Sequence, residues 1–567
     1  MSTPLPATAL DTLEWSWDQW RPAYDELRGA RPMAATLEAW MADWTRLHHL
    51  VSETYARLHL ATTCDTTDAA AEARYRAFLE GVLPQILSAE QELKQALLAS
   101  GLTPTGLAIP LRDMRAEAEL FREANLPLIT EEQQLSNAYN RLIGAQTISW
   151  QGRELTIPQT APLLESPDRA EREQVWRLAS ARQLADREAL NQLWRQLLGL
   201  RRRLAANADK PDYRAYAWAQ YLRFDYTPAD CMRFHEAIEA AAVPAAARVY
   251  ARRASRLGLE RLRPWDVEGK PAGAAPLRPF AGGDELAARG EAVLGRVDEE
   301  LGEHFATMRR EGLLDLDNRK GKAPGGFCTS FPTVGRPFIF MNAVGLPGDV
   351  RTLLHEAGHA FHVFETRGLP YHQQQTAPIE FAEVASMAME LLAAPYLRRG
   401  DGGYYADELG YARARVEHLE SILTFWPYMA VVDGFQHWAY TNPEAADDPA
   451  ECDRAWYGLW GRFMGAVDWS GLDDERATGW HRKQHIYRNP FYYVEYGLAQ
   501  LGAVQVWRNA LADQPGAVAA YRRALALGGT AALPELFAAA GARFAFDTAT
   551  MREAVDLIET TIGELGP

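Results

Sequence analysis

The chain has 567 residues, of which 47% are hydrophobic and 24% are charged. This balance is typical of a globular protein with a large buried core, and it excludes an intrinsically disordered chain. The 75 acidic residues outnumber the 59 basic ones, so the formal net charge is −16. Because an acidic body repels phosphate backbones, we expect no general binding of nucleic acid.

No segment of the sequence predicts a membrane span. The longest strongly apolar runs without a charge, such as residues 421–432, contain about 12 residues, whereas a helix that crosses a bilayer needs about 20. The N-terminal Met-Ser-Thr-Pro-Leu-Pro lacks the basic stretch and apolar core of a signal peptide. The four cysteines form no CxxC pair, which is typical of a reducing compartment. We therefore expect a cytoplasmic protein that binds no membrane.

Helical periodicity dominates the first half of the chain. Apolar residues recur at steps of three and four in several segments. The first four of these segments are residues 34–62, 68–100, 129–145 and 166–205. Residues 147–158 instead alternate polar and apolar side chains around a Gln-Gly pair, which predicts a small β-hairpin. Helical patterns return at 227–258 and at 283–312, with a loop rich in Pro and Gly between them.

The segment 321–348 has a different composition. It is dense in Gly and Pro, and its runs 326–331 and 337–341 are rich in aromatic and β-branched residues. The intervening Pro-Thr-Val-Gly-Arg supplies a turn, so we expect an antiparallel hairpin. After it, Asp349 can cap a helix that runs from residue 350 to about residue 367. The sequence thus predicts a mainly α protein with one small β-sheet next to this helix.

That helix carries the motif His355-Glu356-Ala357-Gly358-His359. Residues four apart on a helix are separated by about 40° around its axis, so both imidazoles lie on one face. Neutral imidazole is a good zinc ligand, and a glutamate in the same turn can act as general base. The alternative is a solvated helix face with two ordinary histidines. The apolar flanks argue against it, because buried histidines without partners would be costly.

The motif does not by itself supply a third zinc ligand. His362 lies on the same face, and it could bind zinc or pack beside the site. The other source is the mostly apolar segment 378–394, which contains Glu380, Glu383 and Glu390. Glu383 and Glu390 are seven residues apart and share a helical face, as expected for a ligand and a carboxylate that supports a histidine. We therefore expect Glu383, and not Glu380, to be the third ligand.

Together these motifs resemble the oligoendopeptidase F branch of the thimet oligopeptidase family of zinc metallopeptidases. The resemblance rests on KAPGGFCTSF at 322–331 with PFIFMN at 337–342, HEAGHAFH at 355–362, EVAS at 383–386, and NPFYYVEY at 489–496 after His485. It is strong from about residue 205 to about residue 510. Before residue 205 it rests only on general helical character.

The resemblance implies a mainly α, two-lobed body with a deep central channel and a small β-sheet beside the zinc helix. Residues 1–205 are expected to form an N-terminal helical region, and residues 206–567 the catalytic region of the same body. A channel of this kind admits only short unstructured peptides. The expected substrates are therefore short peptides, and the expected reaction is the hydrolysis of their internal bonds.

The resemblance also implies a site with one Zn²⁺ per chain, bound by His355, His359 and Glu383. The fourth metal position is expected to hold a water whose pKa is lowered toward neutrality. Glu356 is expected to take the proton of this water and to pass it to the leaving amine.

A group of His and Tyr residues near the C-terminus is expected to bind the oxyanion that forms during hydrolysis. In a chain with 22 tyrosines, the alternative is a set of core aromatics. The resemblance favours His485, Tyr493 and Tyr496 as the oxyanion donors. Because the spacing from the histidine differs between branches of the family, Tyr487 and Tyr492 remain alternatives. His437 and His481 lie near these segments, and we interpret both as structural.

The hairpin at 326–341 has an expected role in substrate binding. An extended peptide can add to an exposed strand through main-chain hydrogen bonds, which predicts broad specificity. A covered strand pair is the alternative. Cys328 lies on this hairpin, and we expect it to be a small filler side chain rather than a reactive thiol, because no nearby base is evident in the sequence.

Two rival functions remain open from sequence. An exopeptidase on a similar zinc helix would need a fixed cation for the terminal carboxylate of its substrate, and Arg336, Arg482 and Arg488 are candidates. A helical peptide-binding or scaffold protein with a structural zinc is the other rival. It is disfavoured because structural zinc sites are usually closed by Cys and His. The sequence leaves the oligomeric state open.

Overall fold

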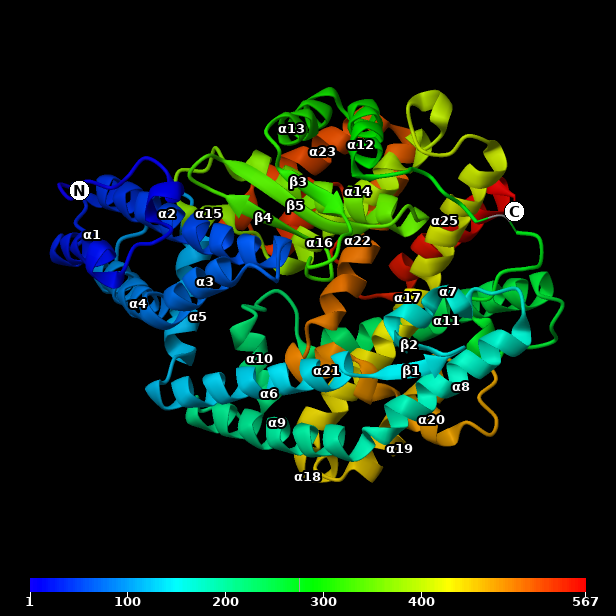
Figure 1. Cartoon of the computed structure of the whole chain (residues 1–567). Helices are drawn as coiled ribbons and strands as arrows, with labels where there is room; N and C mark the ends of the chain where they lie inside the picture. The colour runs from blue at the N-terminus through cyan, green and yellow to red at the C-terminus, as the bar shows by residue number, and fades with distance from the viewer. Residues whose placement is uncertain (275, 567) are drawn as a thin grey trace. The chain divides into compact units, whose positions relative to one another are not determined.

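The computed structural model describes residues 1–274 and 276–566. Helices account for most of these residues, and the strands among them are short (Figure 1). The prediction of a mainly α protein is confirmed. The chain divides into two compact units, which are described separately. Unit 1 contains Met1–Glu119, Leu277–Ala414 and Ala499–Phe544, and unit 2 contains Leu120–Pro276, Arg415–Leu498 and Ala545–Pro567.

The helices and strands of the two units have the following bounds, with short 3₁₀ turns between some of them. Unit 1 contains α1 (Trp17–Gly29), α2 (Leu37–Cys64), α3 (Ala69–Gly81), α4 (Leu83–Ser100), α5 (Ala108–Leu120), α12 (Gly283–Val297), α13 (Glu299–Arg310), β3 (Leu314–Asp317), β4 (Phe327–Phe331), β5 (Arg336–Ala343), α14 (Pro347–Thr366), α15 (His372–Gln375), α16 (Ile379–Ala393), α23 (Gln514–Ala526) and α24 (Leu533–Ala539). Unit 2 contains α6 (Leu126–Gly144), β1 (Thr147–Trp150), β2 (Arg153–Thr156), α7 (Ala161–Leu164), α8 (Arg169–Ala185), α9 (Arg187–Asn207), α10 (Tyr213–Gln220), α11 (Pro228–Arg256), α18 (Pro443–Ala446), α19 (Pro449–Phe463), α20 (Asp473–Ala477), α21 (Gln484–Arg488) and α25 (Thr548–Leu565). A unit boundary falls within α17 (Glu408–Thr441) and within α22 (Tyr493–Ala512), and another separates the last residue of α5, Leu120, from the rest of that helix.

Each unit is assembled from three separate stretches of chain. The predicted division separates an N-terminal helical region (residues 1–205) from the region that carries the catalytic motifs (residues 206–567). This division stays a prediction. The central channel that the resemblance implies likewise stays a prediction.

The three-stranded sheet of unit 1 has the order β3-β5-β4. β4 and β5 are antiparallel, with Phe331 opposite Arg336, so the hairpin predicted at 326–341 is confirmed. Its turn ends at Gly335, which has a φ of 60° and therefore suits a residue without a Cβ. β3 pairs with β5 in parallel and was not predicted. The strand order leaves β4 at an edge of the sheet.

The helix with the HExxH motif begins earlier than the sequence analysis predicted. α14 starts at Pro347, and Asp349 occupies its third position rather than its N-cap. The Asp349 carboxylate accepts hydrogen bonds of 2.8 Å from the backbone amides of Val344 and Leu346. Proline is well suited to the first turn because its missing N–H would have no helical partner there. Asp349 therefore closes the loop before the helix instead of starting the helix.

Helices α14 and α16 approach one another closely at a glycine. A Cβ atom at Gly358 would lie 2.5 Å from the carbonyl oxygen of Ala385 and 2.6 Å from the Cα of Ser386. Gly358 lies between the two histidines of the motif, so the close approach occurs at the site itself. Any larger residue here would push α16 and its carboxylates away from the histidines.

Several segments with a predicted helical pattern contain more than one helix. Residues 283–312 form α12 and α13, with the break at Asp298. The Asp298 side chain accepts hydrogen bonds from the amides of Glu300 and Leu301 at 3.0 and 3.1 Å, so it caps the second helix. Residues 68–100 and 166–205 are likewise divided, at Val82 and Asp186.

The other predicted hairpin, at 147–158, is confirmed as β1 and β2. Its two turn residues, Gln151 and Gly152, have φ values of 48° and 76°. Positive φ at both central residues is the conformation that matches the twist of a two-residue hairpin.

Candidate metal centre

Two imidazoles and one carboxylate converge between α14 and α16. The Nε2 atoms of His355 and His359 lie 3.4 and 3.9 Å from Oε2 of Glu383. All the ligand atoms of this group lie within 4.8 Å of one another. The imidazole side chains are 23% and 25% exposed, whereas the Glu383 side chain is 9% exposed. The group is therefore accessible from the histidine side and closed on the glutamate side.

Further hydrogen bonds orient these side chains. Nδ1 of His355 lies 2.8 Å from Oε1 of Glu390, which leaves Nε2 directed toward Glu383. The hydroxyl of Ser386 donates to Oε2 of Glu383 at 3.2 Å. The contact of Glu390 with a motif histidine agrees with the face shared by Glu383 and Glu390. Ser386 belongs to the EVAS motif, but no feature of the sequence predicted the contact of its hydroxyl.

The electrostatics of the group suit a cation. Burial lowers the pKa of His355, but hydrogen bonds to Glu383 and Glu390 outweigh it and hold this pKa well above its ordinary value. Burial lowers the pKa of His359 to about 4, so this imidazole is neutral and has a lone pair to donate. The carboxylates thus create a field that favours positive charge at the point where the three ligand atoms meet.

We expect Glu390→Gln to lower zinc affinity by about 10–100-fold, the usual cost of losing a group that supports a metal-binding histidine. The variant keeps the size of the side chain and removes its charge. Zinc affinity is measured by competition with a chromogenic chelator. An affinity equal to that of the wild type would show that Glu390 does not support His355.

Glu356 lies in the same helical turn but outside the converging group. It is 7% exposed. Burial raises its pKa to about 7, and the negative charges of Glu383 and Glu390 act in the same direction. The backbone amide of Cys328 on β4 donates to its carboxylate and partly offsets these effects. A carboxyl group with this pKa can both accept and return a proton near neutral pH.

The two alternative ligands, His362 and Glu380, do not belong to the converging group of described residues. His362 is 8% exposed, and its ring makes an edge contact with Phe381 at 6.3 Å. Burial lowers the pKa of His362 to about 4. Glu380 is also buried, at 3% exposure. His362 therefore packs beside the site.

The predicted His and Tyr residues form a separate group in unit 2. The ring of His485 on α21 lies 4.8 Å from that of Tyr493 and 6.0 Å from that of Tyr496, both on α22. Burial lowers the pKa of His485 to about 3, and the nearby cations Lys483 and Arg488 act in the same direction. Burial also raises the pKa of Tyr493 far above its ordinary value. Both side chains are thus neutral near pH 7, as oxyanion donors must be.

A strained turn positions this group. Phe491, just before α22, has a φ of 67°, which is unfavourable for a residue with a Cβ. Its amide donates to Oε1 of Gln436 at 2.7 Å, and its carbonyl accepts from Nη2 of Arg223 at 2.7 Å. The same Arg223 nitrogen donates to Oε1 of Glu495 at 2.6 Å, and both side chains are buried. This clamp fixes the start of the helix that carries Tyr493.

Comparison with known proteins decides the family. The model of peptidase family M3 matches residues 162–281 and 293–555, which is more than half of the chain. The chain belongs to peptidase family M3. Oligopeptidase PepF of Bacillus subtilis (strain 168) is 27% identical to this M3 chain over 219 residues, which are 37% of this chain and 32% of the relative. The match to this curated relative therefore spans less than two thirds of its length.

Solved structures extend the similarity to almost the whole M3 chain. A crystal structure assigned to oligoendopeptidase F is 27% identical, with a TM-score of 0.87, and covers 97% of each chain. A structure of PZ peptidase A with an inhibitor is also 27% identical, with a TM-score of 0.86 over 99% of this chain and 98% of the other. The fold of this chain is therefore that of oligoendopeptidase F.

One charged residue near the His and Tyr group of the M3 chain was not singled out from its sequence. Nζ of Lys483 lies 3.7 Å from the ring centre of Tyr493 and 5.2 Å from that of Tyr428. Burial lowers the pKa of Lys483 to about 7. A lone lysine before a short helix carries no sequence signal for this placement.

Two other predicted residues have partners on or near the hairpin. Burial and the adjacent Glu356 raise the pKa of Cys328 well above its ordinary value, so the thiol stays protonated and unreactive. Arg336 donates to both carboxylate oxygens of Glu311, at 2.8 and 3.0 Å. Its charge is therefore already neutralised by a two-point ion pair.

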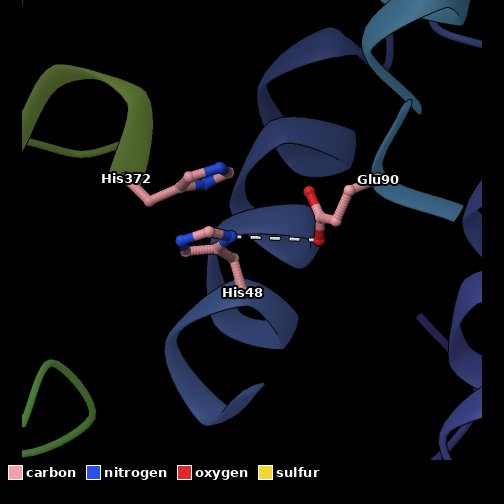
Figure 2. Close-up of side chains that lie close together, drawn as sticks. All are labelled: His48, Glu90 and His372. Atoms are coloured by element: carbon pink, nitrogen blue, oxygen red, sulfur yellow. Dashed lines mark ion pairs between the residues drawn. The ribbon is translucent and has the colours of Figure 1, made fainter. Parts of the chain in front are cut away.

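Figure 2 shows a second histidine cluster of unit 1, formed by His48, Glu90 and His372. The two imidazole rings are stacked, with centres 3.9 Å apart and planes 11° from parallel. An ion bound to an imidazole nitrogen lies close to the ring plane, so it cannot lie in both of these planes. Glu90 instead accepts hydrogen bonds from the hydroxyl of Tyr24 at 2.9 Å and from Nε1 of Trp44 at 2.7 Å. The cluster packs α15, which connects α14 to α16, against α2.

Among the residues that the structure describes, no helix is both long enough and apolar enough to cross a membrane. The cytoplasmic location and the absence of nucleic-acid binding stay predictions.

Proposed function

We propose that this M3 chain is a zinc-dependent oligoendopeptidase that hydrolyses internal bonds of short unstructured peptides. The observation that carries the proposal is the convergence of His355, His359 and Glu383 within 4.8 Å, with Glu356 beside them. Family membership and the fold of oligoendopeptidase F support the same reaction.

The donor set fits zinc. Two imidazole nitrogens and one carboxylate oxygen are the usual three protein ligands of a catalytic zinc, which keeps a further position open. Glu390 holds Nδ1 of His355 at 2.8 Å, so only Nε2 of that ring is available to a metal. When bound, zinc would act as a Lewis acid that polarises the peptide carbonyl and acidifies a nearby water.

Glu356 is the proposed general base. One of its carboxylate oxygens takes a proton from the attacking water and then gives it to the nitrogen of the leaving amine. Its burial between α14 and β4 removes competing solvent, and the amide of Cys328 holds the carboxylate in place. His355 and His359 stay outside this proton transfer, because their role is to bind the metal.

His485, Tyr493 and Tyr496 are proposed to donate hydrogen bonds to the oxyanion of the reacting peptide. Neutral donors aimed at developing negative charge stabilise the transition state more than the ground state. The neutral state of His485, the close packing of the three rings and the clamp at Phe491 support this role. The assignment rests on the family resemblance.

We expect Tyr493→Phe and Tyr496→Phe to lower kcat by roughly 10²–10³-fold, with a much smaller change in KM. Each variant removes one hydroxyl and keeps the aromatic packing. Tyr487→Phe is the matched control, because the Tyr487 hydroxyl contacts the carbonyl of Leu190 at 3.4 Å and its ring stacks on Tyr139. The measurement is steady-state cleavage of a quenched fluorescent peptide. Wild-type kcat in both variants would assign these tyrosines to the core.

The edge strand β4 is the proposed peptide-binding strand. An extended substrate would pair with its main chain, and such pairing reads backbone rather than side chains. The amide of Cys328 already bonds Glu356, which places the general base next to this strand. We therefore propose broad specificity for short extended peptides.

The substrate class is tested with a ten-residue peptide blocked at both ends and with stably folded proteins of higher mass. We expect rapid internal cleavage of the blocked peptide, identified by mass spectrometry, and intact folded proteins. Rapid digestion of folded proteins would overturn the restriction to short peptides. Cleavage only after the blocking groups are removed would favour an exopeptidase. The pairing of Arg336 with Glu311 argues against that role for this arginine.

A further inference from the structure

Unit 2 contains a group of side chains of the types that bind metals, carried by α11 and α17. Cys231 and His235 are one turn apart on α11, and Asp433 and His437 are one turn apart on α17. Each pair therefore presents both of its side chains on one helical face. Cys, His and Asp are all common zinc ligands.

The side chains of this group converge. The ligand atoms of Cys231, Asp433 and His437 lie within 4.8 Å of one another. Oδ2 of Asp433 is 3.3 Å from Nε2 of His437 and 2.9 Å from Nε2 of His235. With ordinary zinc–ligand bond lengths, neighbouring ligand atoms of a tetrahedral site lie roughly 3.3–3.6 Å apart. Cys231, Asp433 and His437 thus meet the same 4.8 Å limit as His355, His359 and Glu383. His235 lies beside these three and is hydrogen-bonded to Asp433, so it is the nearest further ligand.

The group is fully enclosed in apolar surroundings. Cys231 and Asp433 are 0% exposed, and His235 and His437 are 3% and 4% exposed. Aromatic rings cover His437, with ring centres of Trp218 and Phe491 at 5.6 and 5.2 Å. Solvent cannot compensate polar atoms in such a place.

Several polar atoms of the group have no hydrogen-bond partner. Oδ1 of Asp433 and Nδ1 of His437 are buried without one, and Nε2 of His437 has only the 3.3 Å ion-pair contact with Oδ2 of Asp433. A buried polar atom left unsatisfied costs about 1–3 kcal/mol, and more when the group is charged. His437 is buried, its Nδ1 has no partner, and its Nε2 contacts only a carboxylate oxygen that already accepts a hydrogen bond from His235. A ligand that accepts lone pairs from these atoms would remove this cost.

We infer that Cys231, His235, Asp433 and His437 bind a second, structural zinc ion. Four protein ligands close the coordination sphere, which is typical of structural rather than catalytic zinc. The charges also balance, because the dication neutralises one thiolate and one carboxylate in an apolar core. The inference concerns the folding of unit 2, and it does not rest on the proposed peptidase activity.

The zinc joins α11 and α17 beneath the strained turn at Phe491. His437 follows Gln436, whose side chain holds the Phe491 amide at 2.7 Å, and the rings of His437 and Phe491 are in contact. A metal at His437 therefore fixes the part of α17 that supports the start of α22.

The first test measures tightly bound zinc in a variant without the motif histidines, His355→Ala/His359→Ala. The protein is purified from zinc-supplemented cells, dialysed against a chelator in its folded state and analysed by elemental mass spectrometry. We expect about one zinc per chain, because the inferred site is closed to solvent. Zinc well below that ratio would overturn the inference.

The second test adds Cys231→Ser or His437→Gln to the same background. Either substitution is expected to leave the dialysed protein without bound zinc. Cys452→Ser and His481→Gln are matched controls. Cys452 is a buried cysteine that is hydrogen-bonded to the carbonyl of Ala446, and His481 is a buried histidine that is hydrogen-bonded to Asn191. The controls are expected to retain the zinc. Retention in the Cys231 and His437 variants would place the metal elsewhere and overturn the inference.

The third test stays decisive if those two variants fail to fold. The motif-histidine variant is produced in cobalt-supplemented cells, and its near-ultraviolet absorption is recorded. Ligation by Cys231 is expected to give a thiolate-to-cobalt charge-transfer band in the folded protein. Folded, cobalt-containing protein without this band would contradict thiolate ligation, and cobalt-free protein would contradict the site.

Discussion

Replacing Glu356 by Gln is expected to lower kcat for peptide cleavage by about 10²–10⁴-fold, the usual contribution of a general base. The amide keeps the size of the side chain and its contact with the Cys328 amide, but it cannot accept the proton of the attacking water. Both histidines and Glu383 remain, so the zinc content is expected to equal that of the wild type. The measurement combines steady-state kinetics with elemental analysis of the same sample.

Glu365→Gln is the control for this variant, because Glu365 lies on the same helix and pairs with Arg522 at 2.7 Å. We expect it to retain wild-type kcat. A Glu356→Gln protein with near-normal kcat would remove Glu356 from the mechanism. A variant that had lost its zinc would instead show a structural role, so both quantities are needed.

Replacing Glu383 by Ala is expected to lower zinc affinity by more than the roughly 10–100-fold that follows loss of a supporting residue. The carboxylate lies 3.4 Å from Nε2 of His355 and 3.9 Å from that of His359, so its removal takes away the proposed third ligand. Without the Glu383 carboxylate, the two imidazoles would be the remaining ligands, and neither carries a negative charge to balance that of Zn²⁺. The measurement is a zinc titration of chelator-treated protein against a chromogenic competitor.

Glu380→Ala is the matched comparison. Glu380 is a buried carboxylate on the same helix, one turn earlier, and it is outside the converging group. We expect its zinc affinity to stay within the range of a supporting residue. A larger loss of affinity in Glu380→Ala than in Glu383→Ala would show that the other carboxylate binds the metal.

Local features of the fold could be predicted from sequence where a short pattern determines them. The Gln151-Gly152 turn and the turn ending at Gly335 both need backbone conformations that their residues accept easily, and both hairpins form. The HExxH helix was recognised, although its start was misplaced by the interpretation of Asp349 as an N-cap. A proline in the first turn with a carboxylate at the third position is also a signal for a helix start. This signal fits the observed start at Pro347.

Features that depend on contacts between distant segments could not be predicted. β3 has only four residues, and its pairing with β5 lies outside any local pattern. The breaks at Val82, Asp186 and Asp298 were not located because helical periodicity continues on both sides of each. Assembly of each unit from three stretches of chain leaves no mark in composition.

The candidate site shows the same limit. The motif and the spacing of Glu383 and Glu390 indicated which carboxylates share a face, because helix geometry is local. The group of Cys231, His235, Asp433 and His437 was not recognised, since its two helical pairs are separated by about 200 residues. Each pair has the four-residue spacing of a metal-binding helix, and comparing such pairs along the chain could have found it.

Zinc held by His355, His359 and Glu383 is proposed to be required for the cleavage of internal peptide bonds. This requirement is tested most directly by following cleavage of a peptide blocked at both ends before chelation, after chelation and after zinc is returned in equal amount to the chain. We predict internal cleavage that chelation abolishes and that about one added zinc per chain restores. Cleavage that persists after the exchangeable zinc has been removed would contradict the account.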